Sequence, residues 1–146
     1  MTVNMIAESH SSGRRIVPSR ALPQPHFRYS PVVQAGPFVF ISGMVALDPD
    51  TGKLAQGDAS AQTAQILSNL NRLLAEQGWA VEQLILARIF YTGADAFAGA
   101  NSAWEAFFAD HSPPARTSAG VSLLPLGALV EIEFQLYIEA PALNGG

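Results

Sequence analysis

Residues 113–133 read P-P-A-R-T-S-A-G-V-S-L-L-P-L-G-A-L-V-E-I-E. This stretch predicts two β-strands joined by a turn at residues 124–127, because proline followed by glycine between apolar runs is typical of a turn. Beyond the turn, apolar and polar side chains alternate as far as Glu139. Such alternation is the period of a strand that buries one face. We therefore expect a β-hairpin here that contributes to the main sheet.

Two charged residues make this hairpin a candidate site. Arg116 lies just inside the first strand, and Glu131 lies near the start of the second. A hairpin centred near Pro125 would bring the two side chains together across the strands. A guanidinium group binds carboxylates in a two-pronged geometry, and a carboxylate can polarise a water molecule. The pair predicts a site for an organic anion and a water; the alternative is an ordinary ion pair of Arg116 with Glu131 or Glu133.

The composition indicates a single domain that buries more surface than usual. The chain has 146 residues, of which 49% are hydrophobic and only 14% are charged. One domain of this size buries a real core, but the apolar excess favours burial against further copies of the chain. The net charge of −4 argues against a surface that follows nucleic-acid phosphates. The absence of cysteine excludes disulfides, thiolate nucleophiles and cysteine metal ligands.

Other classes of site and location have little support in the sequence. No apolar run approaches the roughly 20 residues of a membrane span, so we expect no membrane contact. Arg14 and Arg15 are not followed by an apolar segment, which argues against an export signal and favours the cytoplasm. The three histidines, His10, His26 and His111, lie in unrelated loops without ligand spacing, so no metal is expected.

The chain divides into a leader and one domain. Residues 1–28 carry Ser, Pro and Arg without sustained periodicity, and we expect them to be partly ordered at most. Residues 29–146 form the domain. Asp58 is a suitable N-cap for a first helix that ends at Gly78, and a second helix starts after Gly93. The further strands are expected at residues 31–34, 38–42 and 84–92.

The expected element order is therefore β-β-α-β-α-β-β. Two helices placed between strand pairs would pack on one face of a single sheet, which gives an α+β domain of two layers. The other face of the sheet then needs a cover. The strand at 84–92 supports this expectation, because its continuous apolar character predicts burial on both faces.

Several motifs in this order resemble one known family. They are Y-S-P-V-V-Q-A-G at residues 29–36 with V-F-I-S-G at 39–43, the helix entry at 58–63, N-x-x-W-E-A-F-F at 101–108, and the P-P-A-R-T and L-P-L-G-A-L-V-E-I-E runs at 113–117 and 124–133. Together they cover residues 29–139. The chain is similar to the Rid (YjgF-like) family of reactive-intermediate enamine/imine deaminases.

The resemblance implies a fold, an assembly and a reaction. The implied fold is the chorismate-mutase-like Rid fold, in a homotrimer whose sheets form a central barrel with clefts between subunits. The implied reaction is hydrolysis of 2-imino or enamine acids to 2-oxo acids and ammonia, without metal or organic cofactor. In it Arg116 holds the substrate carboxylate and Glu131 assists the water. Further cleft residues match at Tyr29 (from the neighbouring subunit), Ser42, Asn101 and Ser118.

Three positions depart from the common pattern of the family. Met44 stands where glutamine is frequent, Ser118 where cysteine is frequent, and Gly120 where glutamate is frequent. Met44 and Gly120 make the cleft less polar, and Gly120 leaves more room. We therefore expect a substrate that is bulkier or more apolar than 2-iminopropionate.

Two other functions remain open from the sequence. The arginine cleft could bind or sense a small carboxylate without turning it over. Some members of the resembled family have been assigned ribonuclease activity, but the acidic charge balance and the dispersed histidines argue against RNA as a substrate here.

Overall fold

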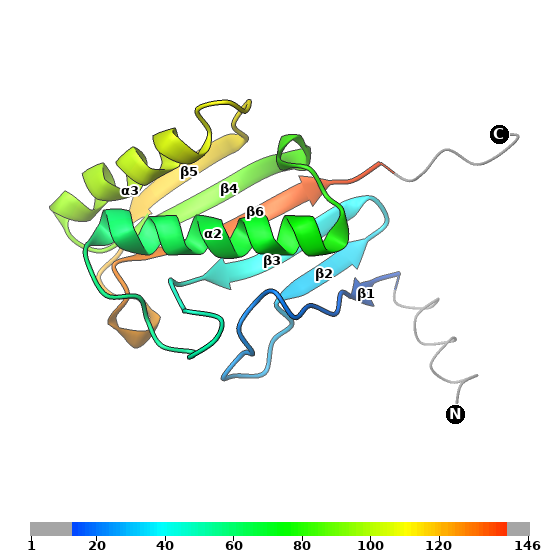
Figure 1. Ribbon diagram of the computed structural model, residues 1–146, viewed down its shortest axis with the longest axis horizontal. Coiled ribbons are helices and arrows are strands. Elements are labelled where there is room, and N and C mark those ends of the chain that lie inside the picture. Colours follow the sequence, from blue (N-terminus) through cyan, green and yellow to red (C-terminus); the bar gives the residue numbers. More distant parts are fainter. Residues whose placement is uncertain (1–12, 140–146) are drawn as a thin grey trace, which may run out of the picture.

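The computed structural model describes residues 13–139, and they form an α+β domain of two layers, as the sequence predicted (Figure 1). Two helices pack on one face of a six-stranded sheet. The strands are β1 (Arg15–Ile16), β2 (Val32–Ala35), β3 (Phe38–Met44), β4 (Leu84–Tyr91), β5 (Ala115–Gly120) and β6 (Val130–Tyr137). The helices are α2 (Ala59–Gln77) and α3 (Ala94–Phe107), and short 3₁₀ helices are η1 (Val81–Gln83) and η2 (Pro125–Gly127).

The ends of α2 are set by the two residues that the sequence indicated. The Asp58 side chain accepts a hydrogen bond from the Ala61 backbone N–H at 2.9 Å, which satisfies a free donor of the first turn. Gly78 follows the last helical residue with φ of 74°, a left-handed conformation that glycine adopts without steric cost. Both predicted caps are confirmed.

The predicted hairpin of residues 113–133 is wrong. The strand order is β1-β2-β3-β6-β4-β5, so β4 lies between the two strands of that stretch. β4 pairs with β5 in parallel and with β6 in antiparallel register. The chain therefore reverses direction between β5 and β6 through η2, but it passes over β4 and the two strands do not pair. The signal at Pro125 and Gly127 marks a real change of direction, but it does not fix which strand becomes the neighbour.

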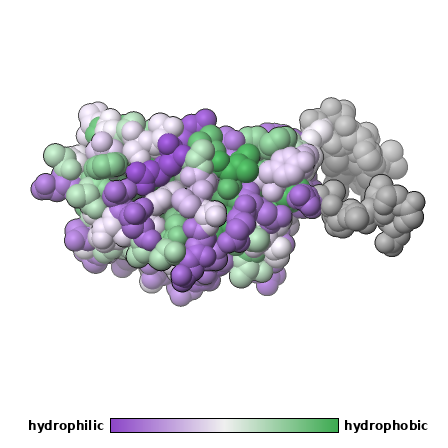
Figure 2. Space-filling model, turned by 90° about the horizontal axis from the view of Figure 1, so that it is seen from above, coloured by the Kyte–Doolittle hydropathy of each residue, from purple (hydrophilic) through white to green (hydrophobic). Residues whose placement is uncertain are grey.

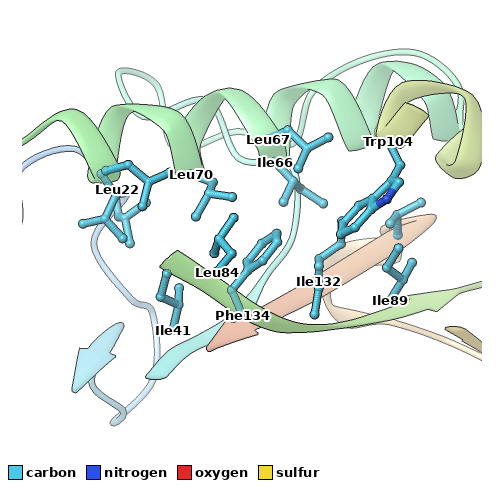
Figure 3. Close-up of a cluster of buried hydrophobic side chains, with 14 of the residues drawn as sticks. Leu22, Ile41, Ile66, Leu67, Leu70, Leu84, Ile89, Trp104, Ile132 and Phe134 are labelled. Atoms are coloured by element: carbon cyan, nitrogen blue, oxygen red, sulfur yellow. The ribbon is translucent and has the colours of Figure 1, made fainter. Parts of the chain in front are cut away.

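The core lies between α2, α3 and one face of the sheet. In β6 the buried residues alternate as predicted, and Val130, Ile132, Phe134 and Leu136 all face the helices. The helices supply leucine, isoleucine and aromatic side chains to the same layer, among them Ile66, Leu70 and Trp104 (Figure 3). Burial of an apolar side chain of this size stabilises the fold by about 1.5–3 kcal/mol.

The sheet face away from the helices stays partly open in a single chain. It carries aromatic residues, and the rings of Phe38 and Tyr137 meet edge to face with centroids 5.3 Å apart. Phe40 of β3 is also exposed. Ile85 of β4 is exposed as well, so the expectation that β4 is buried on both faces is wrong for the isolated chain. Glu131, Glu133 and Arg88 share this face, so it is apolar only where the exposed aromatic residues gather, and that part favours a protein contact. The homotrimer stays a prediction.

Residues 13–28 of the leader contact the domain at several points. β1 pairs with β2 and adds a strand that the sequence did not indicate. The Ser19 hydroxyl donates to Glu76 Oε1 and the Arg20 N–H donates to Glu76 Oε2, both at 2.7 Å. Three apolar residues of the leader are buried in the core, namely Val17, Ala21 and Leu22.

Gly99 allows α2 and α3 to approach closely. A Cβ atom at this position would lie 2.9 Å from the Ser60 backbone nitrogen and 3.2 Å from the Ala59 Cβ. The first distance is shorter than a carbon atom tolerates against backbone, so a side chain here would push the helices apart. The backbones of the two helices approach each other more closely than either helix backbone approaches the sheet. Their spacing therefore sets the geometry of the helical layer.

We expect Gly99→Ala to lower the free energy of unfolding by about 1–3 kcal/mol, the usual cost of overpacking. Helix propensity alone predicts the opposite, a gain of about 1 kcal/mol. Urea denaturation at fixed protein concentration measures the difference. The control is Ala98→Gly on the exposed side of α3, which should show only the propensity loss. A more stable Gly99→Ala variant would mean that the helices are not in backbone contact.

Candidate functional site

The residues predicted for the site fall into two groups that lie on different sides of the sheet. In β6, Glu131 alternates with Val130 and Ile132, which face the helices, so its side chain points to the open face. In β5, Arg116 pairs in register with the buried Ala87 of β4 and points to the helix side. Strand β4 separates the two residues. One chain therefore does not bring Arg116 and Glu131 together, contrary to the prediction from the supposed hairpin.

The first group surrounds Arg116 and holds its guanidinium in place. Arg116 Nη1 donates to Asn101 Oδ1 of α3 at 2.8 Å. The guanidinium carbon lies 5.3 Å from the ring centroid of Trp104, a cation–π contact. Arg116 pairs with no carboxylate among residues 13–139. Glu133 lies on the other face of the sheet and pairs with Arg88 at 3.2 Å. The predicted alternative, an ion pair with Glu131 or Glu133, is wrong within the chain.

The other two predicted positions in β5 lie on the same side of the sheet. Ser118 is in register with Ile89, and its buried hydroxyl has no hydrogen-bond partner among the described residues. Gly120 lies against Tyr91, where a Cβ would be 3.4 Å from the ring. The space at Gly120 is therefore next to an aromatic ring. On the edge that carries α3 and β5, hydrophilic side chains are interspersed with hydrophobic ones (Figure 2).

The second group lines a cavity of about 300 Å³ that contains Tyr29, Ser42 and Glu131. Neither Arg116 nor Asn101 contributes to it. The Ser42 hydroxyl donates to the Ser30 carbonyl oxygen at 2.7 Å, so it holds the end of β3 against residues 29–31. Three of the predicted site residues, from segments far apart in the sequence, therefore share one cavity.

Burial raises the pKa of Glu131 above its ordinary value, and the nearby charge of Glu133 adds to the effect. A carboxylate with a raised pKa is a stronger base than a free one, which suits a group that takes a proton from water. The geometry and the pKa shift thus agree on Glu131 as the basic group of this cavity.

Gly43 belongs to the site and was not predicted. A Cβ at this position would lie 2.9 Å from Glu131 Cδ and 3.0 Å from Oε2, so any side chain would displace the carboxylate. The pairing of β3 with β6 shifts register between Ile41 and Met44. Such a bulge re-aims side chains at the end of a strand. The Ser-Gly pair at residues 42–43 is visible in the sequence, but the need for glycine at residue 43 follows only from its contact with Glu131 in the fold.

Other kinds of site find no support in the described part of the chain. No group of three or more His, Asp or Glu side chains within residues 13–139 could hold a metal ion. Of the helices that the structure describes, none is both long enough and apolar enough to cross a membrane. His10 lies outside the described residues, and the cytoplasmic location stays a prediction.

We expect Glu131→Gln to stabilise the protein at neutral pH. Because the pKa of Glu131 is raised in the folded state, its ionisation favours unfolding. The stabilisation of the folded state by protonated Glu131 is fully present below the pKa of the unfolded chain, near 4.5. It is lost as the pH rises through the pKa of the folded state. The glutamine variant does not ionise, so its advantage should grow with pH. Thermal unfolding between pH 4 and pH 8 measures it.

The control for this measurement is Glu105→Gln, which removes an exposed carboxylate from α3. Its melting temperature should follow that of the wild type at each pH. A Glu131→Gln variant that is less stable than wild type at pH 7–8 would contradict the assignment of Glu131 as a group whose charge is disfavoured.

Comparison with known proteins agrees with the geometry. Residues 19–138 match the family described as Endoribonuclease L-PSP. A RutC family protein of Pyrococcus horikoshii is 33% identical over 126 residues, which are 86% of this chain and 99% of that protein. A 2-iminobutanoate/2-iminopropanoate deaminase of Salmonella typhimurium is 36% identical over 103 residues, which are 69% and 80% of the two chains.

Solved structures extend the comparison to the fold. The crystal structure of YyfA from Yersinia pestis, described as a member of the conserved Rid protein family, superposes with a TM-score of 0.80 and 30% identity. The match covers 86% of this chain and 99% of that one. The chain belongs to the Endoribonuclease L-PSP family, which is the Rid (YjgF-like) family that its motifs indicated.

Proposed function

We propose that the protein hydrolyses 2-imino acids, or the enamines that interconvert with them, to 2-oxo acids and ammonia. The observation that carries the proposal is Arg116, a guanidinium fixed by Asn101 and Trp104 that has no carboxylate partner among residues 13–139. A fixed arginine of this kind is suited to the carboxylate of an organic acid. The deaminase of Salmonella typhimurium supports the choice of acid.

The reaction requires only water and groups that the chain supplies. Arg116 holds the substrate carboxylate and orients the adjacent C=N bond. Glu131 accepts a proton from water while the water oxygen bonds to the imine carbon, which gives a carbinolamine. Glu131 passes that proton to the nitrogen to complete the carbinolamine. It then takes the carbinolamine hydroxyl proton and delivers it to the same nitrogen, so that the C–N bond breaks, the C=O bond forms and ammonia leaves. No electron acceptor or donor is needed, and we expect no cofactor.

We propose that the site assembles between copies of the chain. Arg116, Asn101 and Ser118 lie on the helix side of the sheet, whereas Tyr29 and Glu131 belong to the cavity. A head-to-tail contact between copies would place the first group of one copy beside the second group of the next, and such contacts close into rings. The open aromatic face of the sheet offers an apolar surface for this assembly. The number three comes from the family resemblance, so the homotrimer is part of the proposal.

The family name, Endoribonuclease L-PSP, keeps RNA cleavage as a second candidate. The two described histidines do not form an acid–base pair. His26 lines the cavity, whereas the His111 ring nitrogen Nδ1 lies 2.6 Å from Glu82 Oε2. The chain is also acidic overall, which opposes binding to phosphates. Cleavage of RNA that persists in Arg116→Ala and Glu131→Gln would favour this candidate and a different site.

We expect Arg116→Ala to reduce kcat/KM for 2-iminobutanoate by about 100-fold or more, because two charge-assisted hydrogen bonds to the carboxylate are lost. Arg116→Lys should recover part of this loss, since it restores the charge without the two-pronged geometry. A dehydratase generates the imine in situ, and formation of the 2-oxo acid above the spontaneous rate is the measurement.

The same variants separate catalysis from binding. Calorimetry with a stable 2-oxo acid reports whether Arg116 binds carboxylates at all. Binding that Arg116→Ala abolishes, together with no turnover by wild type, would favour a carboxylate-binding module over an enzyme. Equal rates for wild type and Arg116→Ala, neither above the spontaneous rate, would end the deaminase proposal.

Mixing two inactive variants tests whether each site is shared between copies. In mixed oligomers of Arg116→Ala and Glu131→Gln at equal amounts, roughly one quarter of the sites receive both intact groups. We therefore expect activity to return to about a quarter of wild type after co-refolding, well above either variant alone. Mixing without exchange of subunits is the control. No recovery after confirmed exchange would show that both groups act within one chain.

A further inference from the structure

We infer that the cavity beside Glu131 takes the side chain of the substrate, and that the protein prefers 2-imino acids with large apolar side chains, of the size of a phenyl or isobutyl group. This inference rests on the proposed function. It adds the substrate class and the residues that select it.

The position of the cavity ties it to the reacting carbon. Glu131 lines it together with Ser42 and Tyr29, so a water activated by Glu131 lies at its wall. Besides the imine nitrogen, the carbon that this water attacks carries a carboxylate and a side chain. Its carboxylate is directed to Arg116, which is outside the cavity. The side chain is the remaining group, and the cavity is the space next to it.

The lining of the cavity is mostly apolar, and its inner polar groups are already used. Asn69 is buried, donates to the Leu47 carbonyl oxygen at 2.8 Å and accepts from the Gln65 side chain at 3.0 Å. Ser42 donates to backbone. The other polar lining residues of the leader, Gln24 and His26, are exposed, so a polar substrate side chain would find few free partners at depth. The apolar wall includes Leu22, Phe27, Met44, Val45, Leu47 and Leu126.

The volume selects for size. The cavity measures about 300 Å³, and an engineered apolar cavity of about 150 Å³ already binds benzene. A methyl group, as in 2-iminopropanoate, would leave most of this space to water. Each methylene group that fills such an apolar space favours binding by about tenfold or more.

The outer wall is held in place by contacts far from the reacting carbon. Leu22 follows the segment that Ser19 and Arg20 tie to the Glu76 carboxylate at the end of α2. Gln77 adds a hydrogen bond to the Pro18 carbonyl oxygen at 3.0 Å. The leader is therefore fixed where it passes the cavity, and its apolar side chains form a defined surface. The figure of the core shows Leu22 packed below α2 (Figure 3).

The opposite wall is formed by a residue in an unusual conformation. Leu126 has φ of 61°, a left-handed backbone that leucine rarely adopts. Its side chain is 59% exposed although it lines the cavity. Phe27 on the leader is 77% exposed and lines it too. In the single chain, two large apolar side chains are therefore uncovered at the mouth, where a large substrate side chain would contact them.

Steady-state kinetics with two imines tests the inference. An amino-acid oxidase acting on phenylalanine supplies 2-imino-3-phenylpropanoate, and a dehydratase acting on threonine supplies 2-iminobutanoate. We expect kcat/KM to be about tenfold or more higher for the phenyl imine. Calorimetry with the matching 2-oxo acids should show the same order of affinity. Equal values, or a preference for the small acid, would overturn the inference.

Variants of the wall sharpen the test. Val45→Phe fills the cavity and should lower kcat/KM for the phenyl imine by about tenfold while changing that for 2-iminobutanoate less than about threefold. If this variant does not fold, Leu126→Ala should weaken selectivity for the phenyl imine in the same direction. The matched control is Leu123→Ala, which removes an exposed leucine of the same loop that does not line the cavity. Equal effects of Leu126→Ala and Leu123→Ala would contradict the assignment.

The two proposals fail in different ways. No turnover of either imine defeats the proposed function, and the affinities of the 2-oxo acids then decide the inference alone. Turnover of both imines without preference leaves the proposed function intact and overturns the inference. Size-exclusion chromatography of each variant confirms that its oligomeric state is unchanged.

Discussion

The two-residue period of β6 is the constraint on which the rest of the structure depends. The helices cover only one face of the sheet, so Val130, Ile132, Phe134 and Leu136 must face them. The same period sends Glu131 and Glu133 to the opposite face. Arg116, two strands away on β5, lies on the helix side and packs on Trp104. The packing that stabilises the domain therefore also separates the two charged groups of the proposed site, and a second copy becomes part of the chemistry.

Local signals in the sequence were sufficient for much of the fold. The caps of α2 at Asp58 and Gly78, and the buried face of β6, follow from residue types and spacing alone. The strand order did not follow, because a Pro-Gly turn fixes a change of direction and not a partner. The chain inserts β4 between β5 and β6, and this choice is made by packing of the whole sheet. The predicted hairpin, and the cross-strand contact derived from it, were wrong for that reason.

The same distinction applies to the site. Tyr29, Ser42 and Glu131 could be named from motifs, and the structure places them around one cavity. Arg116 and Asn101 could also be named, and they are bonded to each other. Gly43 could not be assigned, because its role is a contact with Glu131 from a different strand. The wall at Leu22 and Phe27 comes from a segment without periodicity, and only its contacts with α2 reveal it.

The leader is anchored to Glu76, so the groups that react and the surface that shapes the ligand pocket come from different parts of the chain. The sheet and helices fix the reactive groups, whereas a stretch that adds only the two-residue β1 to the sheet shapes the room for the ligand. Substitutions at exposed positions of that stretch, such as Phe27, can alter selectivity while the core keeps its packing. In evolution, substitutions in the leader can therefore change which substrates the protein accepts without altering the sheet and helices that hold the reactive groups.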